Sequence, residues 1–340
     1  MIQVSRLPGA LILGVDGGGS TTRVAIADQD GRVLAMSLGA GVNPMDNERW
    51  QTNLRESVAP LSRYMDRVGQ ACLALPAYGE ARSVTERQQT FVTSLLPHTA
   101  VRLVNDVKAA HAGAFAGTTP GILLLAGTGS MVWGLDASGN DIRVGGWGHV
   151  LSDEGSAYWV GREALSAVCK IVDGRIEGSE FFKAITAQLG LASALSMDAV
   201  LSWYSQLAQP RADVAALSRT VDELAECGDP VAIAVLARAA DELAALVRSA
   251  WGRTGTLETC WTYAGGLFDS RRIRRELEDR LGKPAEPVLP PIGGSLLLAA
   301  EAAEVPTSPL FVDRLAETLH DRLHHHPTGD RDTVAENGVS

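Results

Sequence analysis

The chain opens with short apolar runs separated by glycine-rich turns. Residues 10–15 form an apolar run typical of a buried strand, residues 17–19 are glycines, and residues 21–27 alternate as a second strand. A turn at residues 29–31 leads to a third run at residues 32–36. The pattern predicts a three-stranded meander.

Helical and extended patterns alternate after the meander. The expected elements are a helix at residues 47–68, a strand at 72–75, a helix at 83–96, a strand at 101–104 and an Ala-rich helix at 107–115. Three strands followed by alternating helices and strands predict one α/β lobe.

The same series starts again after residue 117. A strand at residues 122–125 runs into a second glycine-rich turn, and another strand follows at 131–135. Residues 179–251 have an almost wholly helical pattern, and a strand returns at 259–263. Further helices are expected at residues 270–281, 293–304 and 310–323.

These patterns divide the chain into an N-terminal lobe, residues 1–117, and a C-terminal lobe, residues 118–308, with a helical region at about 179–251. A last helix at 309–323 is expected to dock on the N-terminal lobe. The polar tail, 324–340, is expected to be disordered. Its run His324-His325-His326 indicates a solvated helix end more than a metal site.

Composition and charge narrow the classes of function. The 340 residues are 46% hydrophobic and 21% charged, which is typical of a globular protein, and this length predicts two domains. The formal net charge of -10 repels polyanions and anionic lipids, so we expect no nucleic acid and no membrane partner. The four cysteines lie far apart and predict neither a zinc site nor a redox motif. The lack of a leader pattern or a long apolar run predicts a cytoplasmic protein.

The first glycine turn has the chemistry of a phosphate site. Gly17, Gly18 and Gly19 let the backbone adopt positive φ and approach an anion, while Ser20 and Thr21 offer hydroxyl donors. Asp16 would be repelled by phosphate, so its expected role is to hold Mg²⁺, through water. Taken alone, the turn is better explained as an ordinary tight hairpin.

A second turn of the same kind, Gly127-Thr128-Gly129-Ser130, changes this balance. Two strand–turn–strand units in two lobes favour a pair of turns that hold the β- and γ-phosphates of ATP from both sides of a cleft. Neither turn is a Walker loop, because no Gly-Lys-Ser/Thr follows, and neither opens a helix as the dinucleotide fingerprint requires.

Asp106 lies between the two turns, where a strand gives way to a helix. A helix N-terminus favours a carboxylate, so capping is the simpler interpretation. The position between two phosphate turns favours a general base that accepts a proton from an attacking hydroxyl.

Residues 145–159 combine glycines, aromatic residues and carboxylates. A Trp face can cover the apolar side of a pyranose while an Asp accepts hydrogen bonds from its hydroxyls, so the mixture suits a sugar. Helix capping by Ser152 or Asp153 and core packing of the Trp residues explain this segment almost as well.

Read in order, the first turn, Asn105-Asp106, the second turn and Ala264-Gly265-Gly266-Leu267-Phe268 resemble the motifs of the actin–hexokinase–heat-shock-chaperone superfamily. Gly-Gly-Trp-Gly-His at 145–149 and Ser-Asp-Glu-Gly-Ser-Ala-Tyr-Trp at 152–159 resemble the N-acetylglucosamine kinases grouped with the BadF/BadG/BcrA/BcrD ATPases. The resemblance covers about residues 10–305.

The resemblance implies an α/β fold of two ribonuclease-H-like (actin-like ATPase) lobes, with mixed sheets flanked by helices and a helical insertion in the second lobe. It implies an enzyme, an ATP:hexosamine phosphotransferase that uses ATP and Mg²⁺ to phosphorylate N-acetylglucosamine at the 6-hydroxyl. Its partner would be a small-molecule amino sugar. A homodimer is expected by the same analogy.

The resemblance also implies a role for each motif. Asp106 falls on the catalytic base, and Asp16 falls on the carboxylate near Mg²⁺. The nucleotide-binding positions are Asp16, Gly17, Gly18, Gly19, Ser20, Thr21, Gly127, Thr128, Gly129, Ser130, Gly265 and Gly266. The sugar-binding positions are Asn43, Asp106, Gly146, Trp147, Gly148 and Asp153.

One departure from the family bears on the acceptor. Residues 76–80, Pro-Ala-Tyr-Gly-Glu, stand where relatives have a small Ser/Ala-Gly turn. Glucosamine and N-acetylmuramic acid therefore stay open as acceptors beside N-acetylglucosamine. Glucosamine is a cation and would need an uncompensated carboxylate near C2, a role that Glu80 or Glu154 would fill.

Two other functions are weaker. An ATPase activator of a radical dehydratase or reductase holds a [4Fe–4S] cluster between subunits through cysteines, and here no cysteine lies in a glycine-rich turn next to another. A sugar-sensing regulator would need a DNA-binding helix pair ahead of the first turn, for which residues 1–9 leave no room.

Overall fold

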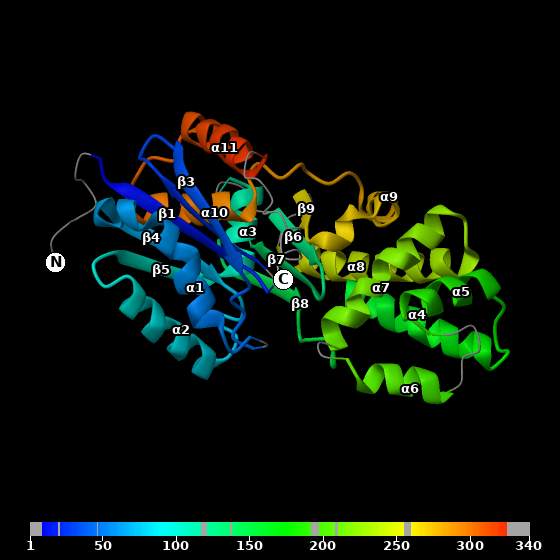
Figure 1. Ribbon diagram of the computed structural model, residues 1–340. Coiled ribbons are helices and arrows are strands. Elements are labelled where there is room, and N and C mark those ends of the chain that lie inside the picture. The colour runs from blue at the N-terminus through cyan, green and yellow to red at the C-terminus, as the bar shows by residue number, and fades with distance from the viewer. Residues whose placement is uncertain are drawn as a thin grey trace, which may run out of the picture. The chain divides into compact units, whose positions relative to one another are not determined.

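The computed structural model of the protein describes residues 9–19, 21–45, 47–116, 121–136, 138–191, 197–207, 210–254 and 260–324 (Figure 1). The chain forms two compact units. The first unit combines Met1–Thr118 with Val288–Ser340, and the second is Thr119–Pro287.

The first unit is built on a five-stranded sheet in the order β3-β2-β1-β4-β5. β1 pairs antiparallel with β2, and β2 with β3, which confirms the predicted meander. β4 and β5 run parallel to β1. The strands are β1 (Leu11–Gly17), β2 (Thr21–Ala27), β3 (Val33–Ala40), β4 (Val68–Leu75) and β5 (Ala100–Asn105).

Helices cover both faces of this sheet. Because side chains alternate along a strand, Leu13 and Val15 of β1 pack with Trp50 on one face, while Ile12 packs with Leu296 on the other. α1 and α2 therefore lie on one face, and α10 and α11 lie on the other (Figure 1). The helices of this unit are α1 (Trp50–Val58), the 3₁₀ helix η2 (Ala59–Arg67), α2 (Arg82–Leu95), α3 (Asp106–Ala114), α10 (Pro291–Ala302) and α11 (Pro309–His324).

The prediction of a single helix over residues 47–68 is wrong. Only Trp50–Val58 is α-helical, and the chain continues as the 3₁₀ helix Ala59–Arg67. Pro60 lies at the start of that second helix. Proline has no N–H to donate, and in an α-helix its ring would press on the carbonyl four residues before, so the α-helix ends here.

Residues 288–308 were expected in the second lobe, but they pack in the first unit. The N–H groups of Val288 and Leu289 donate to the carbonyls of Ala114 and Gly113 at the end of α3, both at 3.0 Å. A Cβ on Gly294 would lie 1.8 Å from the Ala109 carbonyl oxygen. The glycine thus lets the backbones of α10 and α3 meet, a contact that periodicity does not encode.

Helix α11 packs on the meander of the first unit. The Thr318 hydroxyl accepts a hydrogen bond from the Val33 N–H at 3.0 Å, and Arg322 Nη2 donates to the Leu34 carbonyl at 2.9 Å. Phe311 and Leu315 bury their side chains in the core beneath the helix. The polar tail that follows, 325–340, lies outside the described residues, as do His325 and His326.

The second unit repeats the strand order of the first. Its four-stranded sheet has the order β8-β7-β6-β9, which matches β3-β2-β1-β4 in both neighbours and directions. The expected fold class, mixed sheets flanked by helices in two lobes, is confirmed. The strands are β6 (Gly121–Ala126), β7 (Ser130–Leu135), β8 (Asp141–Gly145) and β9 (Cys260–Ala264).

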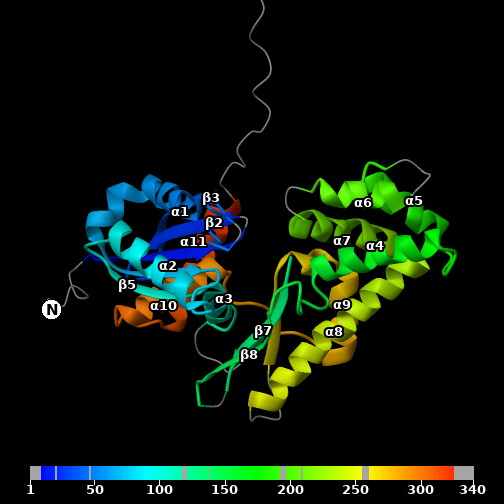
Figure 2. The ribbon, with the colours of Figure 1, turned by 90° about the horizontal axis from the view of Figure 1, so that it is seen from below.

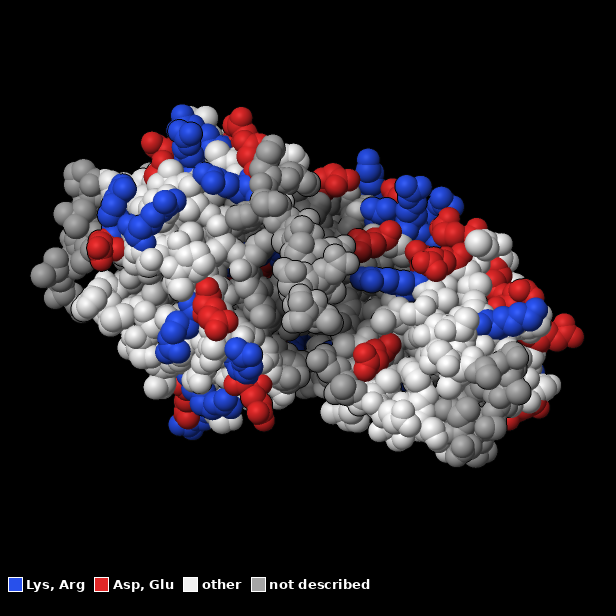
Figure 3. Space-filling model, in the orientation of Figure 1, with Lys and Arg blue, Asp and Glu red and all other residues white. Residues whose placement is uncertain are grey.

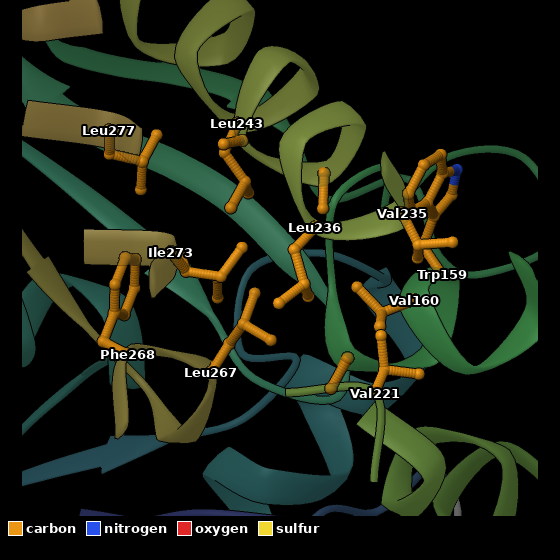
Figure 4. Close-up of a cluster of buried hydrophobic side chains, with 14 of the residues drawn as sticks. Trp159, Val160, Val221, Val235, Leu236, Leu243, Leu267, Phe268, Ile273 and Leu277 are labelled. Carbon is orange, nitrogen blue, oxygen red and sulfur yellow. The ribbon is translucent and has the colours of Figure 1, made fainter. Parts of the chain in front are cut away.

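A helical region packs on the second sheet. Along α8, buried residues recur every three or four positions, as in an amphipathic helix. The helix runs along β7 and β8 (Figure 2). Leu267 and Phe268, which follow the Gly265-Gly266 turn, pack in the same hydrophobic core as the buried residues of α8 (Figure 4). The helices are α4 (Ala157–Val172), α5 (Ser179–Gln188), α6 (Met197–Ser205), α7 (Pro210–Glu226), α8 (Pro230–Thr254), the 3₁₀ helix η3 (Gly266–Asp269) and α9 (Arg271–Leu281).

The surface carries charges of both signs. Lys and Arg side chains alternate with Asp and Glu side chains over the face shown in Figure 3, on each of the two units. Within the described part of the chain, no helix has both the length and the apolar character that crossing a membrane requires.

Candidate active site

The candidate residues of the first unit gather at one edge of its sheet. β1, β4 and β5 are parallel, so their carboxyl ends meet at the same edge. Asp16 lies in register with Ala74 of β4, which in turn lies in register with Val104 of β5. Asp106 follows two residues beyond that row. The strand order therefore brings together the first glycine turn, the 76–80 loop and the predicted catalytic carboxylate.

Asp106 begins α3, but it does not have to serve as the helix cap. Asn105 is the N-cap, and its side-chain oxygen accepts the Val107 N–H at 3.1 Å. The Asp106 carboxylate accepts the same N–H at 3.0 Å through Oδ1. Burial, and then the negative charge of Asp16, raise the pKa of Asp106 from 3.8 to about 7. A carboxylate with this pKa is suited to general base catalysis near neutral pH.

If Asp106 is the general base of the sugar kinase that the resemblance implies, we expect the rate of phosphoryl transfer to depend on the protonation of Asp106. A base must be unprotonated, so kcat/KM should rise as the pH increases through about 7 and level off above it. The measurement is a pH profile of kcat/KM at limiting sugar. A profile that stays flat from about pH 5.5 to 8.5 would exclude a base with this pKa.

Asp16 is buried beside the first turn. Its Oδ2 atom lies 3.5 Å from Arg23 Nη1, and burial raises the pKa of its carboxyl despite that positive charge. Two carboxylates that disfavour each other's ionisation gain from a nearby cation. Mg²⁺ commonly uses one or two carboxylates together with waters and phosphate oxygens. The donor chemistry of Asp16 therefore fits a magnesium ion held through water, with Asp106 left as the base.

The first glycine turn depends on close packing. A Cβ on Gly17 would lie 2.6 Å from Val42 Cγ2 and 3.1 Å from the Ala74 carbonyl oxygen. None of Gly17, Gly18 and Gly19 has the left-handed φ that we expected, and at Gly17 and Gly18 the reason for glycine is steric, since a Cβ on Gly18 would lie 2.9 Å from the Thr21 carbonyl oxygen. Among the described residues, a Cβ on Gly19 would meet no atom within 4 Å, and Thr21 is exposed. Ser20 lies outside the described residues.

Asn43 lies in a loop that is tied to the first turn. The Val42 N–H donates to the Gly18 carbonyl at 2.9 Å. The Asn43 side-chain oxygen accepts the Met45 N–H at 3.1 Å, which closes a local Asx-type turn. The structure therefore places Asn43 in the first unit, next to the glycine turn in the backbone hydrogen-bond network.

In the second unit, the turn at residues 127–129 and the Gly265-Gly266 turn adjoin. Gly265 has a φ of +112°, and a Cβ there would lie 2.3 Å from the Ala126 carbonyl oxygen. A Cβ on Gly127 would lie 3.9 Å from the Gly266 nitrogen. Thr128 is exposed, whereas Ser130 is buried and its hydroxyl donates to the Glu154 carbonyl at 2.7 Å. The Thr128 side chain is thus exposed, whereas the Ser130 hydroxyl is engaged in the protein interior.

The predicted sugar-binding stretch divides into an exposed and a buried part. Gly146 and Gly148 have φ angles of +71° and +88°, and Trp147 between them is 75% exposed. Asp153 is only 3% exposed, and its Oδ2 atom accepts a hydrogen bond from Arg211 Nη2 at 3.0 Å. Trp147 is open to a ligand, whereas Asp153 is packed against the protein.

Comparison with known proteins identifies the family. Residues 13–299 match the BadF/BadG/BcrA/BcrD ATPase family. The chain belongs to this family.

Three relatives of this BadF/BadG-type chain are kinases by name. An N-acetylmuramic acid/N-acetylglucosamine kinase of Clostridium acetobutylicum is 29% identical over 68% of this chain and 76% of its own length. A glucosamine kinase of Vibrio cholerae is 27% identical over 68% of this chain and 77% of its own. The solved structure of a candidate N-acetylglucosamine kinase from Chromobacterium violaceum has a TM-score of 0.71 and 26% identity, and covers 86% of this chain and 100% of that one.

The 76–80 loop of this BadF/BadG-type chain is held by its neighbours. Gln88 Nε2 donates to the Pro76 carbonyl at 2.9 Å, and Asn105 Nδ2 donates to the Tyr78 carbonyl at 3.1 Å. Ala77 has a φ of +61°, an unusual value for a residue with a Cβ. The Glu80 Oε1 atom lies 3.4 Å from Asn105 Nδ2, and the charge of Glu80 also raises the pKa of Asp106. Glu154 instead accepts the Ser152 hydroxyl at 2.9 Å.

Sequence reasoning missed two arginines of the site. Arg23 pairs with Asp16 across neighbouring strands, and the sequence analysis did not single out this residue. Arg211 pairs with Asp153 over a separation of 58 residues. The only local signal for Arg211 was Pro210, which marks the beginning of a helix and says nothing of a partner.

Proposed function

We propose that the protein is an ATP-dependent amino-sugar kinase that transfers the γ-phosphoryl group of ATP to the 6-hydroxyl of N-acetylglucosamine. The observation that carries this proposal is Asp106, a carboxylate at a helix N-terminus with a pKa raised to about 7. The named activities of the relatives support an amino sugar as the acceptor.

The proposed reaction is a direct transfer in which the atoms balance. Asp106 accepts the proton of the sugar 6-hydroxyl as that oxygen forms a bond to the γ-phosphorus. The bond between the γ-phosphorus and the β,γ-bridging oxygen breaks, and ADP leaves. The proton remains on Asp106 until solvent removes it. When bound near Asp16, Mg²⁺ would neutralise phosphate charge.

The two glycine turns supply donors for the phosphates in this proposal. The first unit would offer Thr21 and the Gly19 N–H, because the Gly18 N–H already donates to the Thr21 carbonyl at 2.9 Å. The second would offer Thr128 and the N–H groups of residues 128 and 129, because the Gly127 N–H donates to the Gly129 carbonyl at 2.9 Å. Gly265 and Gly266, which adjoin the second turn, would hold the adenosine. That both turns hold one nucleotide stays a prediction.

For the sugar, we propose contacts from the exposed part of the glycine-rich stretch and from the first unit. Trp147 has the exposure that stacking on a pyranose face requires. The backbone of Gly146 and Gly148 and the side chain of Asn43 would add hydrogen bonds. Asp153 offers little surface at 3% exposure, so a direct sugar contact from it would be confined to one edge of the carboxylate.

Glucosamine is the main alternative acceptor. Its ammonium group would favour a carboxylate near the base, and of the two candidates Glu80 is the one whose charge acts on Asp106. N-acetylmuramic acid carries its own carboxylate, which the charges of Asp16, Glu80 and Asp106 would disfavour. The proposed order of preference is therefore N-acetylglucosamine, glucosamine and then N-acetylmuramic acid.

The alternative function, an ATPase activator of a radical dehydratase or reductase, has less support. The four cysteines lie in four separate places, Cys72 in β4, Cys169 in α4, Cys227 after α7 and Cys260 in β9. Burial raises the pKa of the Cys72 thiol to about 12, so it is a poor thiolate ligand. The expected homodimer stays a prediction that the mass of the protein in solution would test.

A coupled ADP-release assay tests the acceptor. With ATP and Mg²⁺, we expect N-acetylglucosamine to give the highest kcat/KM among N-acetylglucosamine, glucosamine, N-acetylmuramic acid, N-acetylmannosamine and glucose. The kcat/KM for glucose should be at least about tenfold lower, because glucose lacks the amide and would leave the site's partners for it unpaired. A preference for glucose, or no turnover of any of the five sugars, would contradict the proposal.

A further inference from the structure

The Arg211–Asp153 ion pair is fixed at both ends. Arg211 is the second residue of α7, and α7 lies so close to α4 that a Cβ on Gly161 would be 1.9 Å from the Val214 carbonyl oxygen. Asp153 has a left-handed φ of +63°, a conformation that costs free energy in a residue with a Cβ. The salt bridge of 3.0 Å ties this buried carboxylate to Arg211.

The ion pair lies directly against the second glycine turn. A Cβ on Gly129 would be 2.7 Å from Arg211 Nη2 and 2.8 Å from Asp153 Oδ2. Both charged groups therefore touch the backbone that is proposed to meet the phosphates. The Ser130 hydroxyl fixes the end of the same turn through the Glu154 carbonyl, one residue after Asp153.

Arg211 has donor capacity beyond this pair. Its Nε atom is buried and has no hydrogen-bond partner within the described part of the chain. A guanidinium group has five N–H donors in a rigid fork, so one hydrogen bond to Asp153 leaves a planar, charged group beside the turn.

We propose that Arg211 is a positioning residue for the second phosphate turn. Through its ion pair with Asp153 it holds residues 127–129 in the conformation that receives the phosphates of a nucleotide. It thereby couples helix α7 of the helical region to nucleotide binding. The inference rests on the proposed function only in assigning this turn to phosphate.

The test measures ADP binding by calorimetry in the full-length protein, with Mg²⁺ present. We expect Arg211→Met to weaken ADP affinity by about 2- to 30-fold, with KM for ATP rising in parallel and KM for the sugar changing less. Arg211→Lys should recover part of the loss, because it keeps the charge but not the planar fork. Asp153→Asn should weaken ADP to a similar extent, and the double variant should add little.

The matched control is Arg238→Met. Arg238 forms an ion pair of 3.0 Å with Glu163 in the same unit, between α8 and α4, and neither residue is among the nearest neighbours of a Cβ on Gly127 or Gly129 in the described part of the chain. We expect it to leave ADP affinity unchanged. Equal weakening by Arg238→Met, or native ADP affinity in a folded Arg211→Met variant, would overturn the proposal.

The readout separates this proposal from the proposed function. If the unaltered protein binds ADP but phosphorylates no amino sugar, the proposed function fails and the role of Arg211 is still measured. If the unaltered protein does not bind ADP, the turn is not a phosphate site and the proposal for Arg211 fails. If Arg211→Met does not fold, Arg211→Lys is compared with the unaltered protein instead. Native ADP affinity and a native melting temperature in both Arg211→Lys and Asp153→Asn would overturn the proposal for Arg211.

Discussion

Replacing Asp106 with Asn should lower kcat by about 10²–10⁴-fold while leaving ADP affinity nearly unchanged. The amide keeps the shape of the side chain and can still accept a hydrogen bond from the Val107 N–H. It cannot take a proton from the acceptor hydroxyl, so the loss should appear in kcat. The measurement is steady-state kinetics at saturating ATP and sugar, beside calorimetry with ADP.

The same variant should be more stable than the unaltered protein at alkaline pH. The folded-state pKa of Asp106 is raised from 3.8 to about 7, so the native state binds this proton more tightly than the unfolded chain. Stability should therefore fall as the pH rises from about 4 to 7, and the Asn variant escapes that penalty. The melting temperature of Asp106→Asn should exceed that of the unaltered protein at about pH 8 and approach it at about pH 4.

A control for Asp106 is available in the same unit. Asp66→Asn removes an exposed carboxylate in η2 and should change kcat by less than about twofold. Near-full sugar phosphorylation by Asp106→Asn would remove Asp106 from the role of base. A loss of ADP binding as large as the loss of kcat would indicate damage to the fold instead.

Replacing Gly265 with Ala should weaken ADP binding by about tenfold to a hundredfold and lower the melting temperature. Gly265 combines a φ of +112° with a Cβ position 2.3 Å from the Ala126 carbonyl oxygen, so the turn must move away from β6. That movement shifts the neighbouring turn at Gly127 and opens the core at Leu267 and Phe268. Calorimetry with ADP and a thermal melt measure the two effects.

Gly252→Ala is the matched control for this substitution. Gly252 is in α8, and a Cβ there would have no neighbour within 4 Å among the residues that the structure describes. Alanine is the better helix former, so the variant should melt at the same temperature or slightly higher and bind ADP normally. ADP affinity at the native level in Gly265→Ala would mean that this turn does not hold the nucleotide.

Local patterns were enough to predict the repeated part of the fold. The alternation of residues 21–27 and the glycines on either side predicted the meander, and the same series at residues 122–135 predicted its repeat. Asp106 became a candidate base because it lies between the two glycine turns, and its place at the start of a helix followed from the strand and helix patterns on either side. Hydrophobic periodicity and the order of motifs along the chain predict structure correctly where residues that are close in sequence determine it.

Other features depend on contacts between distant residues, and the sequence did not reveal them. The assignment of residues 288–308 to the first unit depends on Gly294 meeting Ala109, a backbone contact over long sequence separation. The burial of Asp153 depends on Arg211, in a helix that starts far along the chain. The expected positive φ at Gly17 was wrong because the need for glycine comes from Val42 and Ala74.

Phosphorus NMR of the reaction product tests the central claim most directly. After incubation of the protein with ATP, Mg²⁺ and N-acetylglucosamine, we predict equal amounts of ADP and a sugar phosphate monoester attached at the 6-position, formed only when the sugar is present. Release of inorganic phosphate from ATP without any sugar phosphate would contradict the account.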